Sequence, residues 1–587
     1  MEKLTALRAQ MKERGLDGYV ITSGDAHSSE YVSPYWRVRE WLSGFTGSSG
    51  LVVVTATKAG LWTDGRYFIQ AAKELEGTGI DLYKVGEPDV PKYTEFLKEN
   101  LPPEGRLGFD GRTVTATEYG ALKKQLKNIS FAYQEDIAGN LWAARPPLPH
   151  GEAFEHEQKF AGTVNKLQVV RDKMKEKKIT TYLIVALDDI AWLTNIRGTD
   201  IPSTPVVYAY ALITEKDAHL FIDLKKVPKQ LEAKLITQGF TLNDYHALTA
   251  KLRTMPTGGK LLYNGKKTNV LLSEAIPSGI KLATKPEMDI IPLLKAIKSD
   301  EELANIKNAY TKESIVIVKM LKWLEDSMHL NKHLTEIDVV KFLSEKRLEQ
   351  AYCLGDSFPT IAAYGANAAQ MHYRVENMGA QIKYEGFLLV DTGGQYLDGT
   401  TDTTRTIPMG ELTQEMIKDF TLVLKGHINL ASAVFLKGTT GHALDILARQ
   451  PLWMEHQNYR SGTGHGIGYC LGVHEGPQNI AQLSNTVALA PGMLVTNEPG
   501  VYKEGKYGIR TENVLLVQEL TKNDDGTFYN FTPITYCPIN TSAIDKSILS
   551  QSELEYLNTY HKKVYETLAP LLTPDEGAWL KRVTKEI

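Results

Sequence analysis

Four carboxylates in the second half of the 587-residue chain adjoin apolar runs that are typical of buried strands. Asp391 follows the run FLLV, and Asp402 comes eleven residues later in the stretch TTDTTRT, on what should be the paired strand. Glu498 ends the run MLVTNE, and Glu512 opens the run ENVLLV. Carboxylates held close together repel one another, and each must be desolvated. The pattern therefore predicts that a positive group lies between them.

One histidine belongs to the same set. His465 lies in the stretch SGTGHGIG, whose glycines let the backbone come close to whatever the imidazole binds. Alternation along TTDTTRT places Asp402, Thr404 and Thr406 on one face of a strand. Four carboxylates and one imidazole suit hard or borderline divalent ions: Mn²⁺, Co²⁺ and Fe²⁺ fit this oxygen-rich set, and Zn²⁺ stays an alternative. Four negative charges match two such ions, which together can bridge a hydroxide and make it a nucleophile.

Composition and charge exclude other classes of function. The formal net charge of −4 gives no basic field of the kind that nucleic-acid-binding proteins use. The three cysteines, Cys353, Cys470 and Cys537, are too few and too widely spaced for a disulfide framework or a cysteine-rich zinc site. The first residues lack the apolar core of a signal peptide, and no apolar run approaches the roughly 18–20 residues of a membrane span. We therefore expect a cytoplasmic protein with neither a nucleic-acid nor a membrane partner.

The first half of the chain contains an internal repeat. LTALRAQMKERGLDGYVIT (4–22) resembles LQVVRDKMKEKKITTYLIV (167–185), and each reads as an amphipathic helix followed by a strand. A Trp-Leu pair and then a further strand-like stretch follow in the same order in both copies. The repeat is too long for a solenoid, so it predicts two successive α/β domains of the same fold.

Two boundaries follow from composition and capping signals. The stretch 144–163 is rich in proline and then in charged residues, as linkers are. Ser299 and Glu302 have the spacing of a capping box, which predicts a long helix from there to about Met328. Beyond it we expect amphipathic helices at 412–437, 441–456 and 551–569. These helices alternate with strand and turn segments, the pattern of an α+β domain.

The motifs around the candidate ligands are similar to those of the dinuclear metallopeptidases with the pita-bread (creatinase/aminopeptidase) fold. DTGGQYLDGTTDTTRT, GTGHGIGYCLGVHEGP, NEPGVYKEGKYGIRTEN and SFPTIAAYGANAAQMHY resemble the Xaa-Pro aminopeptidase (aminopeptidase P) branch in particular. SGFTGSSG and WTDGRYFIQAAKEL in the first domain, and ALDDIAWLTNIRG in the second, extend the likeness over nearly the whole chain. The resemblance implies the long form: two creatinase-like α/β domains at 1–157 and 158–300, then a pita-bread catalytic domain at 301–587.

The resemblance also implies a role for each candidate residue. The metal ligands would be Asp391, Asp402, His465, Glu498 and Glu512, holding two divalent ions, most naturally Mn²⁺ with Co²⁺ or Zn²⁺ as alternatives. Glu498 would also act as general base toward the bridging hydroxide. His372 and His474 would flank the substrate, steady its scissile carbonyl and move protons. The substrate-binding set would be Arg66 in the first domain together with His372, His465, His474 and Arg510.

The implied reaction is hydrolysis of the first peptide bond of a chain whose second residue is proline. The partners would be such peptides, and the family implies a homodimer. Two alternatives stay open: a prolidase-like dipeptidase of the same fold, and a catalytically dead pita-bread domain that binds peptides. All five ligand positions are filled, which argues against the second. One departure stands out: Ser461 occupies a place where many relatives have a histidine that faces the substrate proline.

Overall fold

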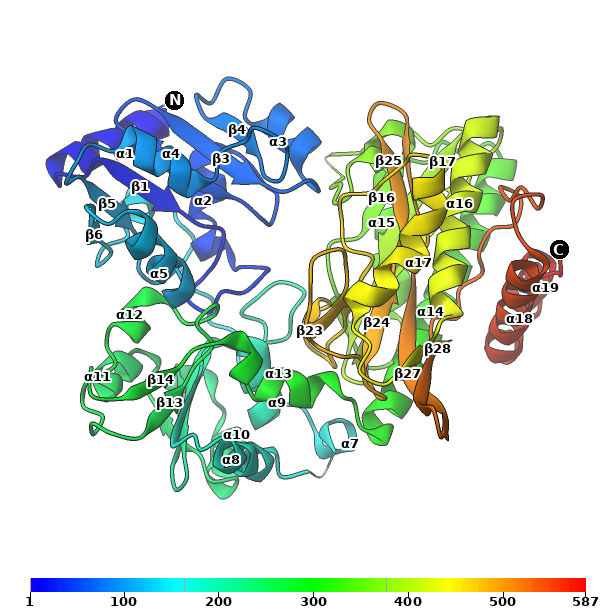
Figure 1. Ribbon diagram of the computed structural model, residues 1–587. Helices are drawn as coiled ribbons and strands as arrows, with labels where there is room; N and C mark the ends of the chain where they lie inside the picture. The colour runs from blue at the N-terminus through cyan, green and yellow to red at the C-terminus, as the bar shows by residue number, and fades with distance from the viewer. Residues whose placement is uncertain (1, 163, 376) are drawn as a thin grey trace. The chain divides into compact units, whose positions relative to one another are not determined.

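The computed structural model describes residues 2–162, 164–375 and 377–587, which fold into two compact units (Figure 1). Within the described ranges, the first unit comprises residues 2–157 and 164–291, and the second comprises 158–162, 292–375 and 377–587. None of the helices in the described part of the chain combines the length and the apolar character that crossing a membrane requires.

The first unit contains two six-stranded sheets with the same topology. One has the order β4-β3-β2-β1-β5-β6 and the other β12-β11-β10-β8-β13-β14. In each, the third strand in this order (β2 or β10) is antiparallel to both of its neighbours, and the other three pairings are parallel. The first sheet comprises β1 (Gly18–Ile21), β2 (Leu51–Thr55), β3 (Ala59–Thr63), β4 (Asp81–Lys84), β5 (Arg106–Phe109) and β6 (Ser130–Ala132). The second comprises β8 (Thr181–Ile184), β10 (Ala209–Thr214), β11 (Ala218–Ile222), β12 (Thr241–Asn243), β13 (Lys260–Leu262) and β14 (Lys281–Ala283). The predicted duplication of an α/β fold is confirmed.

Each sheet is preceded by a helix whose apolar stripe it covers. In α1 (Glu2–Glu13) the residues Leu4, Leu7 and Met11 are buried, and in α8 (Lys166–Glu176) their counterparts are buried at the same helical spacing. The other helices of this unit are α2 (Val38–Ser43), α3 (Phe68–Glu74), α4 (Tyr93–Asn100), α5 (Ala116–Gln125), α6 (Ile137–Asn140), α9 (Leu187–Thr194), α10 (Lys229–Thr237), α11 (Leu248–Arg253) and α12 (Val270–Ser273). A two-stranded ladder, β7 (Phe154–Glu155) with β9 (Ile196–Arg197), completes it.

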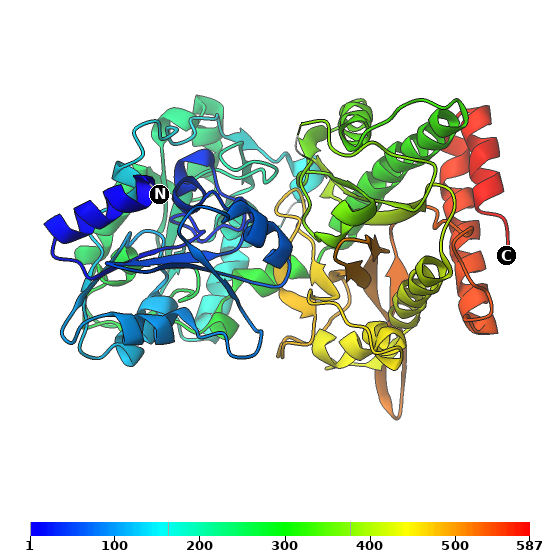
Figure 2. The ribbon, with the colours of Figure 1, turned by 90° about the horizontal axis from the view of Figure 1, so that it is seen from above.

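The second unit places its strands between two helix pairs. Figure 2 shows the green pair α14 (Asp300–His329) and α15 (Glu336–Leu348) on one side of the strands and the yellow pair α16 (Gln414–Ala431) and α17 (Gly441–Met454) on the other. The remaining helices are α7 (Gln158–Ala161), α13 (Ile291–Ala296), α18 (Gln551–Leu568) and α19 (Pro574–Val583). The prediction for this part of the chain, an α+β domain in which helices alternate with strand and turn segments, is confirmed.

Two sheets of the second unit carry most of the predicted site. One has the order β16-β17-β20 and comprises β16 (Ile361–Tyr364), β17 (Phe387–Thr392) and β20 (Thr403–Pro408). The other has the order β21-β28-β27-β24 and comprises β21 (Val434–Leu436), β24 (Leu494–Asn497), β27 (Asn513–Asn523) and β28 (Gly526–Pro533). Shorter ladders add β15 (Cys353–Asp356), β18 (Gly394–Tyr396), β19 (Gly399–Thr400), β22 (Gly464–Gly466), β23 (Glu475–Ile480), β25 (Gly500–Lys503) and β26 (Tyr507–Arg510).

Alternation along β17 sends successive side chains to different layers. Phe387 stacks on Phe420 of α16, whereas Leu388 and Val390 belong to the core that α14 and α15 cover. The same alternation turns Asp391 away from α14 and α15, and turns Thr392 toward them. The strand end is thus fixed from both sides.

The predicted helices agree with the structure with one exception. Ser299 and Glu302 form the capping box that opens α14, as predicted. The helix expected over 412–437 ends at Ala431, and Val434–Leu436 forms the edge strand β21. Phe435 is buried between two exposed neighbours, the period-two pattern of a strand, and continuous helical periodicity was the wrong interpretation there.

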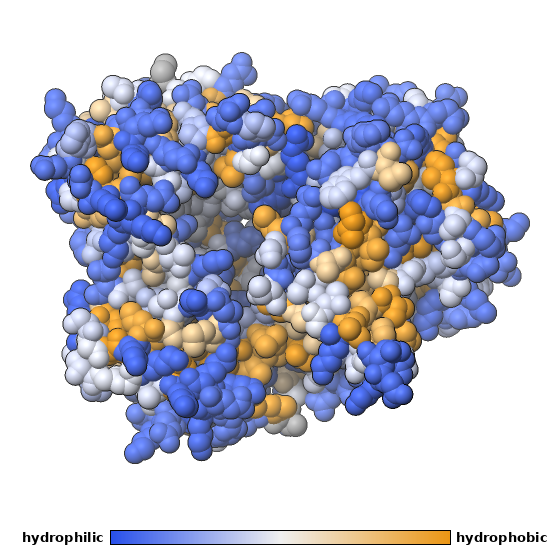
Figure 3. All heavy atoms as spheres, viewed as in Figure 1, coloured by the Kyte–Doolittle hydropathy of each residue, from blue (hydrophilic) through white to orange (hydrophobic). Residues whose placement is uncertain are grey.

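In Figure 3 apolar side chains reach the surface among polar ones; exposed examples in this unit are Val434, Leu436, Trp453 and Leu520.

Candidate metal centre

The five predicted ligands form one cluster in the second unit. Three overlapping groups each have ligand atoms within 4.8 Å of one another: Asp402 with His465 and His474, His465 with Glu498 and Glu512, and Asp391 with Asp402 and Glu512. Because each group shares a member with the next, the side chains are continuous in space although they come from five separate segments.

The first two carboxylates are placed by an antiparallel strand pair. β17 pairs with β20 so that Asp391 faces Thr404 and Thr392 faces Thr403. Asp402 therefore lies one step before the paired part of β20, beside Asp391, and its backbone N–H donates to the hydroxyl of Tyr310 at 3.2 Å. Both carboxylates are buried.

A second antiparallel pair places the two glutamates at one end of its ladder. Asn497 at the end of β24 faces Asn513 at the start of β27, so Glu498 and Glu512 both lie one residue beyond the ladder, on the same end. Thr404 joins the two pairs: its hydroxyl donates to Glu512 Oε2 at 2.7 Å, and its carbonyl accepts from the Glu512 N–H at 3.2 Å.

His465 presents one ring nitrogen to the carboxylates. Its Nδ1 lies 2.9 Å from the carbonyl oxygen of Gly466, which can only accept, so Nδ1 carries the proton. Nε2 then lies 3.3 Å from Glu498 Oε1 and 3.5 Å from Asp402 Oδ2. This tautomer, held by a backbone carbonyl, is the one in which histidine binds a metal through Nε2.

The carboxylates and the imidazole perturb one another strongly. Burial raises the pKa of the Asp391 carboxyl to about 7 against the pull of Arg510, and the charges of Asp402 and Glu498 add to the rise. Burial and the same neighbouring acids raise the pKa of Glu512 well above its ordinary value. Burial lowers the pKa of His465, but its contacts with Asp402 and Glu498 outweigh this and raise it well above the usual range. The cluster therefore binds protons unless cations take their place.

Two buried oxygens test whether cations fit. Asp391 Oδ1 and Glu512 Oε1 are buried and have no hydrogen-bond partner among the residues that the structure describes. An unsatisfied buried acceptor costs about 1–3 kcal/mol, and more when it is charged. Asp391 and Glu512 belong to one group with Asp402, in which one ligand atom from each residue lies within 4.8 Å of the others. The donor set and its unpaired oxygens fit two divalent ions.

Arg510 holds a proposed ligand from the side. Its Nη2 donates to Asp391 Oδ2 at 2.5 Å, its Nε to the Thr404 hydroxyl at 3.0 Å, and its Nη1 to the Tyr502 hydroxyl at 2.7 Å. Thr404 was already expected on the face of Asp402 from strand alternation. Sequence reasoning missed Tyr502, because a tyrosine in the β25–β26 hairpin carries no signal of its own.

The two histidines predicted to flank the substrate lie in the same unit. His474 is half-buried, and its ring packs edge-on against His465 with centroids 4.2 Å apart. His372 is half-buried in the turn after the 3₁₀ helix η5 (Gly365–Ala369), which packs against β17, β25 and β26. Gly508 permits this packing, since a Cβ there would lie 1.8 Å from the carbonyl oxygen of Ala368. Their substrate role stays a prediction.

Arg66 and Ser461 lie outside the cluster contacts. Arg66 belongs to the first unit, between β3 and α3, where its Nε and Nη2 each donate to Asp64 at 2.8 Å. Ser461 is half-buried, and its carbonyl accepts from Arg449 Nη2 at 2.8 Å. The substrate contacts predicted for these positions stay predictions.

Comparisons with known proteins agree over the whole chain. The family model described as metallopeptidase family M24 matches residues 304–519, and the C-terminal region of that peptidase matches 527–587. The creatinase/prolidase N-terminal domain matches twice, at 3–141 and at 144–302.

Relatives of known name match along nearly their full length. Aminopeptidase P2 of Arabidopsis thaliana is 38% identical, covering 98% of this chain and 88% of that protein. A probable Xaa-Pro aminopeptidase P of Tuber melanosporum (strain Mel28) is 38% identical, covering 100% of this chain and 99% of its own. The crystal structure of X-prolyl aminopeptidase from Caenorhabditis elegans, described as a cytosolic enzyme with a di-nuclear active site, superposes with a TM-score of 0.95 at 33% identity, covering 100% of this chain and 99% of that one. The chain therefore belongs to the Xaa-Pro aminopeptidase (aminopeptidase P) family of M24 metallopeptidases, in the long form with two creatinase-like domains before the pita-bread domain.

Proposed function

We propose that this chain is a metal-dependent aminopeptidase that removes the first residue of peptides whose second residue is proline. The observation that carries the proposal is the cluster of four carboxylates and one imidazole, three of its carboxylates buried, with two carboxylate oxygens unpaired among the described residues. Support also comes from the full-length similarity to proteins named Xaa-Pro aminopeptidase P.

The proposed metal ligands are those predicted from the sequence: Asp391, Asp402, His465, Glu498 and Glu512. When bound, two divalent ions supply Lewis acidity and lower the pKa of a water molecule. The set has four oxygen donors to one nitrogen, which favours Mn²⁺ among the candidates. Metal analysis of the purified protein tests this identity: two equivalents of Mn²⁺ per chain are expected, and two of Zn²⁺ would replace that assignment.

Glu498 is the proposed general base. Its Oε1 accepts from the Thr496 hydroxyl at 3.2 Å and faces His465 Nε2. Without metal, burial would raise its pKa, but the hydrogen bond and charge of His465 lower it below the ordinary value. We propose that the Glu498 carboxylate accepts a proton from the attacking water. His474, packed on His465, and His372 are proposed to donate to the oxyanion that develops on the scissile carbonyl and to return the proton to the leaving proline nitrogen.

Proline at the second position explains why a dedicated enzyme is needed. A Xaa-Pro bond has no N–H, and proline fixes its own φ, so a site that binds a substrate N–H cannot accept it. We propose that a wall near Ser461 meets the pyrrolidine ring and that Arg66 binds the peptide, as the resemblance implies. Arg510 is proposed to act through Asp391, which it contacts directly.

The domain limits, assembly and location are proposed with the function. The division 1–157, 158–300 and 301–587 is supported by the ranges of the four family-model matches. A cytosolic location is supported by the description of the Caenorhabditis elegans protein. A homodimer rests on the family resemblance alone; light scattering should then give twice the mass of the 65.4-kDa chain.

A product assay on Arg-Pro-Pro and Gly-Pro tests the function. With Mn²⁺ the full chain should release free arginine and leave Pro-Pro, and a chelator should abolish this release. A tripeptide left whole while Gly-Pro is cut would instead identify a dipeptidase. A protein that binds no Mn²⁺ and cuts neither peptide would be the binding module.

A further inference from the structure

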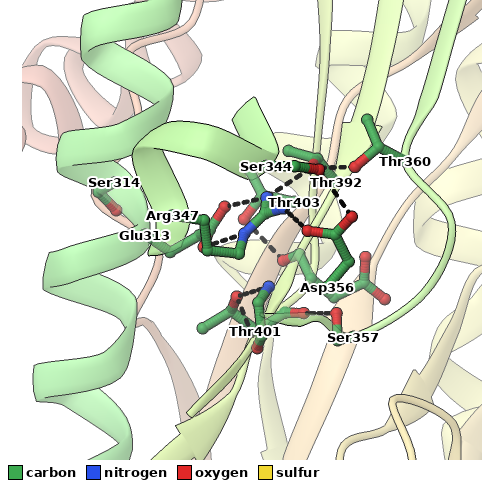
Figure 4. Close-up of polar contacts among 12 residues, drawn as sticks. Glu313, Ser314, Ser344, Arg347, Asp356, Ser357, Thr360, Thr392, Thr401 and Thr403 are labelled. Carbon is green, nitrogen blue, oxygen red and sulfur yellow. Dashed lines mark hydrogen bonds and ion pairs between the residues drawn. The ribbon is translucent and has the colours of Figure 1, made fainter. Parts of the chain in front are cut away.

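A buried guanidinium lies behind β17, on the side opposite to Asp391. Arg347 of α15 is fully buried, and its Nε and Nη2 donate to the two carboxylate oxygens of Glu313 on α14 at 3.0 and 2.7 Å. Its Nη1 forms an ion pair with Asp356 of β15. Figure 4 shows the guanidinium between the two acids, with Thr392 beside them.

Thr392 connects this group to a proposed metal ligand. Arg347 Nη2 also donates to the Thr392 hydroxyl at 2.6 Å, and the Thr360 hydroxyl lies 2.9 Å from the same oxygen. Thr392 directly follows Asp391, and successive strand side chains point to opposite faces. Arg347 therefore binds the end of β17 on the face opposite to the cluster, one residue from Asp391.

The two glycines after Thr392 keep the network close to the strand. A Cβ on Gly394 would lie 2.8 Å from both Arg347 Cδ and Glu313 Oε2, and a Cβ on Gly393 would lie 1.9 Å from the Thr401 carbonyl oxygen. The hydroxyl of Tyr396 donates to Glu313 Oε2 at 2.7 Å. In the sequence DTGGQY, Asp391 is the proposed ligand and Thr392 is the residue that Arg347 contacts. The two closely packed glycines follow, and Tyr396 then contacts Glu313.

Stability alone gives such a network little reason to exist. The desolvation of a buried ion pair offsets most of its attraction, and apolar side chains of similar volume often stabilise a protein as well. A metal ligand, by contrast, must be held within about 0.5 Å of its working position, which packing and outer hydrogen bonds achieve. Resting on the proposed function, we propose that Arg347 is a positioning residue that orients Asp391 for metal binding through the hydroxyl of Thr392.

The experiment starts with three single substitutions in the full chain. Thr392→Val removes the hydroxyl and keeps the shape, whereas Thr392→Ser keeps the hydroxyl. Thr421→Val is the matched control: the Thr421 hydroxyl is also buried, donates to the Ile417 carbonyl at 2.8 Å and accepts from the Asp545 N–H at 2.9 Å, but contacts no proposed ligand among the described residues. Calorimetric titration of the metal-stripped proteins with Mn²⁺ gives the affinity, and Arg-Pro-Pro hydrolysis gives kcat and KM.

The expected result separates positioning from general destabilisation. Thr392→Val should weaken Mn²⁺ binding about 10- to 100-fold, the usual cost of losing an outer partner of a ligand, and Thr392→Ser should restore it. Thr421→Val should lower the melting temperature and leave the affinity for Mn²⁺ unchanged. The double variant Glu313→Gln/Arg347→Met removes the ion pair without stranding Glu313, and should weaken binding as Thr392→Val does. Adding Thr392→Val to it should cost little more, since the two changes break one connection.

The outcomes distinguish this proposal from the function on which it rests. If the parent binds Mn²⁺ and Thr392→Val binds it equally tightly, the positioning role is wrong and the proposed function stands. If Thr392→Ser loses as much affinity as Thr392→Val, the hydroxyl is not the connection and the role is again wrong. If the parent binds no Mn²⁺, the proposed function fails and the positioning role fails with it.

Discussion

The two strand pairs that carry the proposed ligands are alike on the side of the metal cluster and differ on the opposite side. Both end an antiparallel ladder at a pair of carboxylates. Behind β17 lies a charged network, in which Arg347 is paired with Glu313 and Asp356. Behind β24 and β27 the partners are mainly neutral: Asn497 and Asn513 face each other across the ladder and both contact the buried His427 of α16.

The cation behind the second pair also differs from Arg347. Arg405 of β20 donates to the carbonyl oxygens of Glu512 at 2.6 Å and of Thr404 at 2.8 Å, and to Asn513 Oδ1 at 2.8 Å. Its other partners are the carbonyls of Cys537 and Pro538 and the Tyr560 hydroxyl, so no carboxylate pairs with it among the described residues. Burial, with Arg405 nearby, lowers the pKa of His427 to about 3, so this imidazole is neutral. A ligand-bearing strand can thus be fixed by matched charges or by backbone carbonyls, and the two should fail differently.

The largest effect should come from the front of the second pair. Glu498→Gln removes the proposed base and one anionic ligand, while the amide can still accept from the Thr496 hydroxyl. We expect kcat for Arg-Pro-Pro to fall about 10²- to 10⁴-fold or more, the range that general bases contribute. Far-ultraviolet circular dichroism should show an intact fold, because nothing behind the strand changes. A kcat equal to that of the parent would remove Glu498 from its assigned role.

Removing one member of the charged network should cause the largest loss in the free energy of unfolding. Arg347→Met leaves Glu313 buried without its cation, since among the described residues only the Tyr396 hydroxyl still donates to it. We expect a loss of about 3–5 kcal/mol in the free energy of unfolding of the second unit, measured by urea titration. The double variant Glu313→Gln/Arg347→Met should recover most of this loss. Equal destabilisation of the single and double variants would mean that the charges were not matched to each other.

The neutral residues next to β24 and β27 should instead make the stability of the protein depend on pH, through His427. With a folded pKa of about 3 and an unfolded value near 6.5, His427 binds protons mainly in the unfolded state between these values. Its contribution to stability is therefore present above pH 6.5 and is lost as the pH falls. We expect the parent to lose about 2 kcal/mol between pH 6.5 and pH 5 that His427→Gln does not lose. Parallel stability curves for the two proteins over this range would contradict a buried neutral imidazole.

Sequence reasoning predicted the front of the site and missed its backing, for a physical reason. A carboxylate at the end of an apolar run, as at Asp391 or Glu498, is conspicuous because the run itself predicts burial. Glu313 and Arg347 instead lie within amphipathic helices, where charged residues usually face water, and they are 34 positions apart. Glu313 and Arg347 point inward because α14 and α15 pack on β17. The sequence of neither helix alone predicts that packing. The same limit explains β21, whose three residues are too few to show a period of two against the helix before them.

The smallest effect should come from a substitution at Ser461, the residue proposed to face the substrate proline. Ser461 is held through its backbone carbonyl by Arg449, so its side chain can change without breaking that contact. Ser461→His should raise the preference for proline over alanine at the second substrate position by about tenfold. That change is about 1.4 kcal/mol, within the roughly 1–3 kcal/mol that one pocket contact contributes. The ratio of kcat/KM for Arg-Pro-Pro and Arg-Ala-Pro measures it. Mn²⁺ affinity and the free energy of unfolding should stay at the parent values, because the backbone contact of Ser461 with Arg449 does not depend on its side chain. An unchanged ratio would show that this position does not face the proline ring, and a changed Mn²⁺ affinity would show that the front wall and the ligands are coupled after all.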